Sequence, residues 1–433
     1  MIQRTLQFDQ TPPLAASLRY FLSAPLFLIA AAILLMWHGP SILISRWTPA
    51  TLALTHLITL GYLGLTMMGA LFQLLPVLAP VQLSWARQMS NAVFGFLLAG
   101  ASLLPVAFFL QAAYLFTLAL VCLSGALVCL FIPMAYGIAV IPATPAAATI
   151  RAVRLALLAL GFAVVIGIVL GTAFAWPQQS SLPVHLLTEL HVLWAVPGWV
   201  GLLIIGVAFQ VVPMFMVTPL YAPIFTRWLA PTLFLLLLGY CTARFTGWPA
   251  VAHWSGVFIA IGYLAFATVS LILLARRTRP KADATTLFWR LAMVCGMGSA
   301  MAWLTSAAFD LVLTPIALGV LFIVGFAGSA VNGMLYKIVP FLLWYHAKEK
   351  AGMHHRSPSI KQLLVDASGR IQFCLHGCAL MLLVAAALLP DLLARPAGAA
   401  LAISIGLLEL NLIGAVRRYY LAVRIMPSPV VVA

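Results

Sequence analysis

The sequence predicts an all-α membrane protein with about twelve transmembrane helices, arranged as three parallel four-helix repeats. Three observations lead to this fold class. The chain of 433 residues is 64% hydrophobic and only 7% charged, with a mean hydropathy of +1.12, which is typical of polytopic membrane proteins. Its apolar segments are about 20 residues long, the length that spans a bilayer. Finally, one motif occurs three times along the chain.

Hydropathy places the helices, in chain order, at 16–37, 50–76, 89–110, 113–139, 152–176, 186–214, 227–246, 250–275, 286–310, 314–345, 371–390 and 397–417. Four consecutive helices form each repeat, within a single transmembrane domain that covers 1–433. The repeats span approximately 16–140, 150–275 and 286–420. The only sizeable polar loop, 346–370, is expected on the cytoplasmic face between the tenth and eleventh helices.

The motif has the form G-x2-G-x4-G-x3-[QK]-x2-P and falls on the second, sixth and tenth helices. Its copies run from Gly61 to Pro76, from Gly198 to Pro213 and from Gly325 to Pro340. Because a whole repeat of four helices separates successive copies, the three motif helices run in the same direction, unlike those of inverted-repeat transporters. The glycines are interpreted as sites of close helix packing; the alternative is that they leave room for a flat cofactor.

Charge sets the expected orientation. With a cytoplasmic N-terminus, about 20 of the 23 Lys and Arg residues lie on the inner side, and only Arg46, Arg244 and Arg395 lie outside. Both termini are then cytoplasmic. The net charge of +15 reflects this distribution, so we expect a lipid bilayer and no nucleic acid as partner.

The sequence has no C-x-x-C-H motif, which excludes covalently attached c-type haem.

Histidines are the main candidates for chemistry. His56 and His191 lie near the outer ends of two motif helices, and His185 precedes the second of them. Imidazoles inside membrane bundles are common ligands of haem iron and copper, although residues at helix ends also bind carbonyl groups or lipid headgroups. On an ideal helix, at about 100° per residue, His56 faces away from the glycine stripe of its motif, whereas His191 lies close to its own.

Two further charged residues lie inside predicted spans. Lys337 occupies the polar position of the third motif, and Glu409 lies within the twelfth helix at a similar depth. Because an unpaired carboxylate is costly in a membrane, we predict a buried ion pair between them. The motif-like run Cys374, His376 and Cys378 is not expected to bind metal, since the histidine points away from both cysteines on a helix.

The number of helices, their three parallel repeats and a histidine that opens the second helix resemble subunit I of the haem–copper oxidases. This resemblance implies that His56 in THLITLG ligates a b-type haem and that His191 in HVLWAVPGW ligates copper or acts as a second ligand. It also implies a bacterial inner-membrane location and respiratory or electron-transfer partners. The tenth helix opens TPIALGVLFIVGF and the seventh reads LAPTLFLLLLGYCTARF, both without histidine. A complete oxidase centre is therefore not expected.

The sequence is more similar to the divergent, NnrS-like branch of these proteins, which is tied to nitric-oxide metabolism. The leading hypothesis is thus a protein of this fold that binds haem b, copper or both. The alternatives are a non-redox channel or transporter, and an assembly factor, built on the same scaffold. Whether the chain is an enzyme stays open at this stage.

Overall fold

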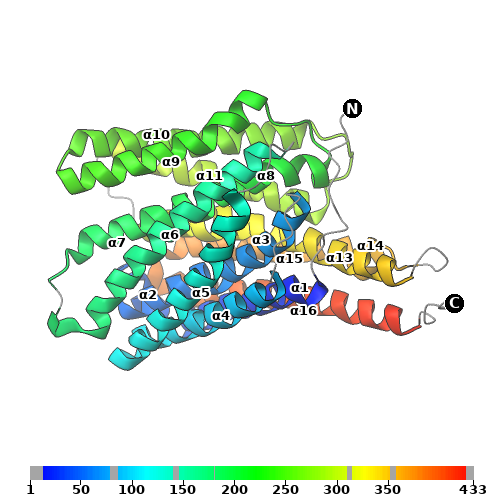
Figure 1. The fold of residues 1–433 in the computed structure, drawn as a ribbon, viewed down its shortest axis with the longest axis horizontal. Coiled ribbons are helices and arrows are strands. Elements are labelled where there is room, and N and C mark those ends of the chain that lie inside the picture. Colours follow the sequence, from blue (N-terminus) through cyan, green and yellow to red (C-terminus); the bar gives the residue numbers. More distant parts are fainter. Residues whose placement is uncertain are drawn as a thin grey trace.

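The computed structural model describes residues 13–78, 86–139, 146–179, 181–309, 315–351 and 357–425, which form a bundle of long helices (Figure 1). Within these ranges, twelve helical segments are long and apolar enough to cross a membrane. The prediction of an all-α multi-pass membrane protein is confirmed. α1 begins and α16 ends at the same end of the bundle, as an even number of crossings requires (Figure 1).

The helices follow the order expected from the repeats. The first repeat contains α1 (Leu14–His38), η2 (Gly39–Leu43), α2 (Pro49–His56), η3 (Leu57–Gly64), α3 (Leu65–Leu78), α4 (Ala86–Leu110) and α5 (Ala113–Ala139). The second contains α6 (Ala147–Ala175), η4 (Pro177–Gln179), α7 (Val184–Leu193), η5 (Trp194–Gly201), α8 (Leu202–Met216), α9 (Pro223–Thr246) and α10 (Pro249–Ala275). The third contains α11 (Ala284–Phe309), α12 (Pro315–Gly319), η6 (Val320–Gly328), α13 (Ser329–Ala351), α14 (Ile360–Leu363), α15 (Asp366–Ala386) and α16 (Pro390–Ile425).

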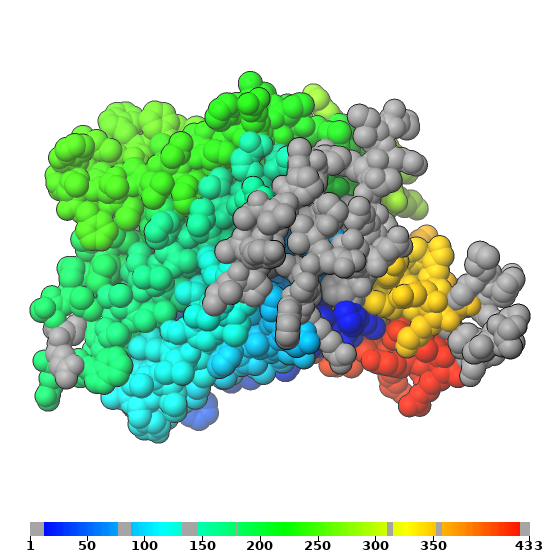
Figure 2. Space-filling model, viewed as in Figure 1, coloured from blue at the N-terminus to red at the C-terminus, as the bar shows by residue number. Residues whose placement is uncertain are grey.

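Helix contacts repeat in the same way around the molecule. The last two helices of each repeat pack together, as α4 with α5, α9 with α10 and α15 with α16. The last helix then packs against the first helix of the next repeat, and α16 closes the ring against α1. In the view of Figure 2, the first repeat (blue to cyan) covers the lower side and the second (green) the upper side. The motif helices pack on the first helix of their own repeat, and η6 contacts both η3 and η5.

Each motif helix contains a π-helical segment, in which backbone hydrogen bonds span five residues instead of four. These segments are η3, η5 and η6, and each ends at the second glycine of the motif. At Gly64 and Gly328, an added Cβ would lie 3.2 and 3.3 Å from the carbonyl oxygen five residues earlier. Glycine at this position therefore relieves crowding that the wider turn creates.

The first and third glycines of each motif allow the motif helix to pack closely against the first helix of its repeat. An added Cβ at Gly69, Gly206 or Gly333 would lie 2.6, 2.6 and 2.8 Å from the Cβ of a residue on α1, α6 and α11, respectively. Carbon atoms prefer separations of about 3.5–4.0 Å, so only glycine fits. The close-packing interpretation of the stripe is confirmed at these positions.

The sequence predicted a polar loop at 346–370, and the structure corrects this prediction, because much of the described part of this segment is helical. α13 continues to Ala351, α14 follows, and α15 begins at Asp366. Ser359 starts α14 through a capping box, which supplies partners for backbone groups that a polar loop would leave to water. Residues 352–356, which include His354 and His355, lie outside the described residues.

Candidate functional site: a histidine pair between two repeats

His56 is the last residue of α2, immediately before the π-helical segment η3. Its Nδ1 lies 2.7 Å from the carbonyl oxygen of Leu52, one turn earlier on the same helix. The ring stacks on Phe108 of α4, with centroids 5.3 Å apart and planes 28° apart. The ring orientation is therefore fixed by one hydrogen bond and one aromatic contact.

His191 lies on α7, in the second repeat. Its Nδ1 lies 2.8 Å from the carbonyl oxygen of Ala163 on the neighbouring helix α6. One turn further along α6, Gly167 leaves room for the ring, since a Cβ there would lie 2.9 Å from the His191 Cε1 atom. The second repeat thus provides both an acceptor and a space for this imidazole.

The structure brings these two histidines together. Their ring centroids are 6.4 Å apart and their planes differ by 24°. A carbonyl oxygen only accepts hydrogen bonds, so the proton of each neutral ring is on Nδ1 and the lone pair is on Nε2. Among the described residues, neither Nε2 has a hydrogen-bond partner. Both rings are only half-buried, so neither is sealed by packing.

This arrangement has the features of a pair of metal ligands. Metal-binding histidines usually donate their second N–H to a carbonyl or carboxylate, which fixes the tautomer and the ring orientation. Two imidazoles on opposite sides of one ion have centroids about 6 Å apart, since each metal–nitrogen bond is about 2.0 Å long and the ring centroid lies about 1 Å beyond the nitrogen. Within the described residues, however, no group of three or more His, Cys, Asp or Glu side chains converges on one point.

A π-helical segment separates each of the two histidines from the later part of its motif, so the phase counted along an unbroken α-helix holds for neither. A π-helical turn contains about one residue more than an α-helical turn. Each inserted residue rotates the preceding part of the helix by about 100° relative to an ideal α-helix. The sequence analysis set His56 opposite the glycine stripe because it assumed an unbroken α-helix. In the structure, η3 separates His56 from the later part of the motif.

The other histidines of this end lie apart from the pair. His185 is exposed, and its ring forms a T-shaped contact with Trp47, with centroids 4.7 Å apart. It precedes His191 by six residues, or about 9 Å along a helix. His38 contacts Phe109 and His253 contacts its neighbour Trp254. The metal-binding role predicted for His185 stays a prediction, at a position separate from the pair.

The predicted ion pair between Lys337 and Glu409 is wrong. Lys337 instead forms an ion pair with Asp283, with Nζ and Oδ2 2.8 Å apart. Glu409 is 7% exposed, and its Oε2 has no hydrogen-bond partner within the described residues. Similar depth was not enough to predict a contact, because Asp283 lies just before α11, the helix against which α13 packs.

Asp283 has a second function at the same position. Its Oδ1 accepts hydrogen bonds from the backbone N–H and the hydroxyl of Thr286, so it caps α11. Burial by itself raises the pKa of Asp283, but the hydrogen bonds from Lys337 and Thr286 and the lysine charge together lower this pKa below its ordinary value. The carboxylate is therefore charged at neutral pH and holds Lys337 in place.

A buried polar network inside the membrane was not predicted. The Tyr62 hydroxyl donates to Asn332 Oδ1 at 2.6 Å, which joins the motif helices of the first and third repeats. Asn332 Nδ2 and Ser329 Oγ lie 3.2 and 2.9 Å from the two ring nitrogens of His376 on α15. The only sequence signal was the polar character of these residues within apolar spans.

The expectation for the Cys374–Cys378 run is consistent with this network. His376 is 1% exposed and points into the bundle, whereas the two cysteines are exposed on the other face of α15. The three side chains do not converge, as the helix period predicted.

Comparisons with known proteins do not assign a family. No protein-family model matches the sequence, and no curated protein sequence matches it. The similarity to haem–copper oxidase subunit I therefore stays a prediction that rests on the motif helices and on the two histidines.

Proposed function

We propose that this protein is a bacterial inner-membrane protein with the architecture of haem–copper oxidase subunit I, in which His56 and His191 hold one metal centre and no complete oxidase centre forms. The observation that carries the proposal is the proximity of these two imidazoles from different repeats, each with Nδ1 on a backbone carbonyl. The distribution of basic residues supports cytoplasmic termini.

The donor set fits either of two groups. A b-type haem takes one or two axial imidazoles, and copper also favours imidazole nitrogen. Bound to these residues, either group would supply one-electron redox chemistry or bind a small gas such as nitric oxide. Respiratory or electron-transfer partners follow from the same proposal.

The protein itself provides orientation and an apolar surrounding on one side of the pair. The carbonyl oxygens of Leu52 and Ala163 hold both Nδ1–H groups, so each Nε2 lone pair keeps one direction. Phe108 covers one face of His56, and it packs on Phe116 and Phe174 in an aromatic cluster that excludes water from this side. The geometry thus fixes the orientation of two imidazoles and leaves the Nε2 atom of each available as a nitrogen ligand.

Metal analysis and a spectrum test the proposal. The full chain is expressed with haem and copper supplied, purified in mild detergent, and analysed for bound iron and copper and for a Soret band in the reduced minus oxidised spectrum. We expect about one metal ion per chain, with a Soret band if it is haem iron. His56→Ala and His191→Ala should each lose this metal while they keep the elution volume of the folded protein.

His253→Ala is the matched control, because this histidine is exposed and lies apart from the pair. It should retain the metal content of the unchanged protein. A protein that carries neither iron nor copper after this expression would refute the proposal and favour the channel, transporter or assembly alternatives. Retention of the metal in both pair variants would refute the assignment of ligands.

A further inference from the structure

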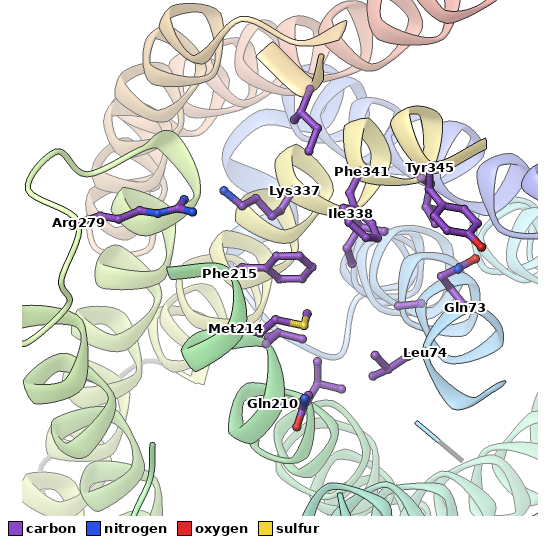
Figure 3. Close-up of a pocket in the computed structure, with 15 residues that line it drawn as sticks. Gln73, Leu74, Gln210, Met214, Phe215, Arg279, Lys337, Ile338, Phe341 and Tyr345 are labelled. Atoms are coloured by element: carbon purple, nitrogen blue, oxygen red, sulfur yellow. The ribbon is translucent and has the colours of Figure 1, made fainter. Parts of the chain in front are cut away.

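A cavity lies between the three motif helices, at the opposite end from the histidine pair. Its volume is about 430 Å³. The polar positions of all three motifs line it, namely Gln73, Gln210 and Lys337 (Figure 3). His56 and Gln73 are 17 residues apart on the first motif helix, or about 25 Å along its axis. The cavity is therefore a second site, formed by the threefold arrangement itself.

The walls of this cavity are mainly apolar. Aliphatic and aromatic side chains from α3, α8 and α13 form most of the lining, with Met214, Phe215, Ile338 and Phe341 facing the open space in Figure 3. Among the described residues that line it, none is acidic. An occupant would therefore be largely apolar and would meet no negative side chain among these residues.

Two cations line the cavity on one side. Lys337 comes from α13, and Arg279 comes from the segment between α10 and α11 (Figure 3). The backbone N–H of Thr278 donates to the carbonyl of Val217 at 3.1 Å, which ties this segment to the end of α8. The charge of Lys337 is partly balanced by Asp283, but Arg279 is exposed and has no ion pair or hydrogen bond within the described residues.

The repeat itself shows that Lys337 is not required for packing. The other two repeats carry glutamine at the same position and build the same helix with the same π-helical segment. A lysine within an apolar span costs free energy unless it is paired or used. Asp283 pairs with it, and Asp283 already caps α11 with its other oxygen. The amino group is thus held at the cavity wall.

We propose that this cavity binds an amphipathic monoanion, with its carboxylate or phosphate group at Arg279 and Lys337 and its apolar tail between the motif helices. A volume of about 430 Å³ holds roughly 14 groups of the size of water, at about 30 Å³ each. This is the size of a fatty acid of about twelve carbons, or of the headgroup and first part of one chain of an anionic phospholipid.

Binding of laurate to the full chain in phosphatidylcholine nanodiscs tests this proposal. Dodecanol and dodecyltrimethylammonium serve as neutral and cationic ligands of equal tail length. We expect a saturable rise in melting temperature with laurate and a much smaller one with the other two, because a ligand stabilises the state that it binds. Equal shifts with all three ligands would overturn the proposal.

Charge variants locate the site. Arg279→Gln and Lys337→Gln should each weaken laurate binding about ten-fold, since each removes a charge-assisted hydrogen bond. Arg276→Gln is the matched control: it is exposed, lies on the same segment and does not line the cavity. Within the described part of the chain, Arg279 has no ion pair or hydrogen bond to lose, so its variant tests the site even if Lys337→Gln is unstable. Unchanged affinity in Arg279→Gln would overturn the proposal.

The source of the anion is decided by changing the lipid. If an anionic phospholipid is the natural occupant, phosphatidylglycerol in the nanodisc should compete with laurate and should co-purify with the unchanged protein but not with Arg279→Gln. If a soluble carboxylate is the occupant, phosphatidylglycerol should leave laurate affinity unchanged. Both results support an amphipathic anion, and Ala70→Phe, which puts a ring into the cavity, should abolish binding in either case.

Discussion

Replacement of Gly206 by alanine should destabilise the protein, because the added methyl group would clash with the neighbouring helix α6. The added Cβ would lie 2.6 Å from the Cβ of Ala152 on α6 and 3.5 Å from the Thr149 carbonyl oxygen. Carbon atoms prefer separations of about 3.5–4.0 Å. A methyl group of alanine has no rotamer that moves it away, so α6 and α8 must separate by about 1 Å.

The expected cost follows from this separation. Overpacking of a tightly packed contact costs about 1–3 kcal/mol, and alanine regains up to about 1 kcal/mol because it favours helix more than glycine does. Gly95→Ala on α4 is the control, because nothing lies within 4 Å of its Cβ position. Both variants share the gain in helix propensity, so the difference between them isolates the overpacking cost, about 1–3 kcal/mol.

Unfolding in mixed micelles with increasing dodecyl sulfate, followed by circular dichroism, measures this difference. Gly206→Ala should unfold at a lower detergent fraction than both the unchanged protein and Gly95→Ala. If Gly206→Ala were as stable as Gly95→Ala, the third glycine of the motif would not set the distance between helices, and the packing rule inferred for the repeats would fail.

Three further outcomes are expected. Gly167→Ala should push the ring of His191 off its carbonyl acceptor and lower metal affinity about 10–100-fold, as loss of supporting contacts commonly does, with metal content of the purified protein as the readout. Tyr62→Phe removes the hydrogen bond to Asn332 and should cost about 0.6–2 kcal/mol in the same unfolding assay. The folded-state pKa of Asp283 is lowered, so its stabilisation is present above the unfolded pKa of about 3.9 and is lost as pH falls through the folded value. Acid unfolding below about pH 4 should therefore be steeper in the unchanged protein than in Asp283→Asn.

The fold was predictable because its signals are local in the sequence. Hydropathy depends on runs of about 20 residues, and the described spans match the predicted ones to within a few residues at most ends. The repeat was visible because the glycines that set helix distance occur at constant spacing. These glycines contact the first helix of each repeat, so the same geometry selects the same residue three times.

The details of the site depend on features that sequence does not display. A π-helical segment follows His56, so the face of this residue does not follow from a count along an ideal α-helix. The partner of Lys337 was missed because Asp283 lies just before α11, outside the expected spans, and the prediction considered only charges within them. A signal was present, since Asp283 precedes Thr286 at the spacing of a helix cap, at the same end of the bundle as Lys337.

The three repeats share one backbone but differ in the polar groups that they carry, and this difference separates scaffold from function. The positions equivalent to His56 in the second and third repeats hold Leu193 and Val320, and those equivalent to His191 hold Leu54 and Leu318. The packing of the repeat is therefore compatible with apolar residues at both of these positions. A polar or charged side chain in a membrane span costs free energy that packing does not offset. The histidine pair at one end and Lys337 at the other break the threefold pattern, and these are the two places where we propose that a group is bound.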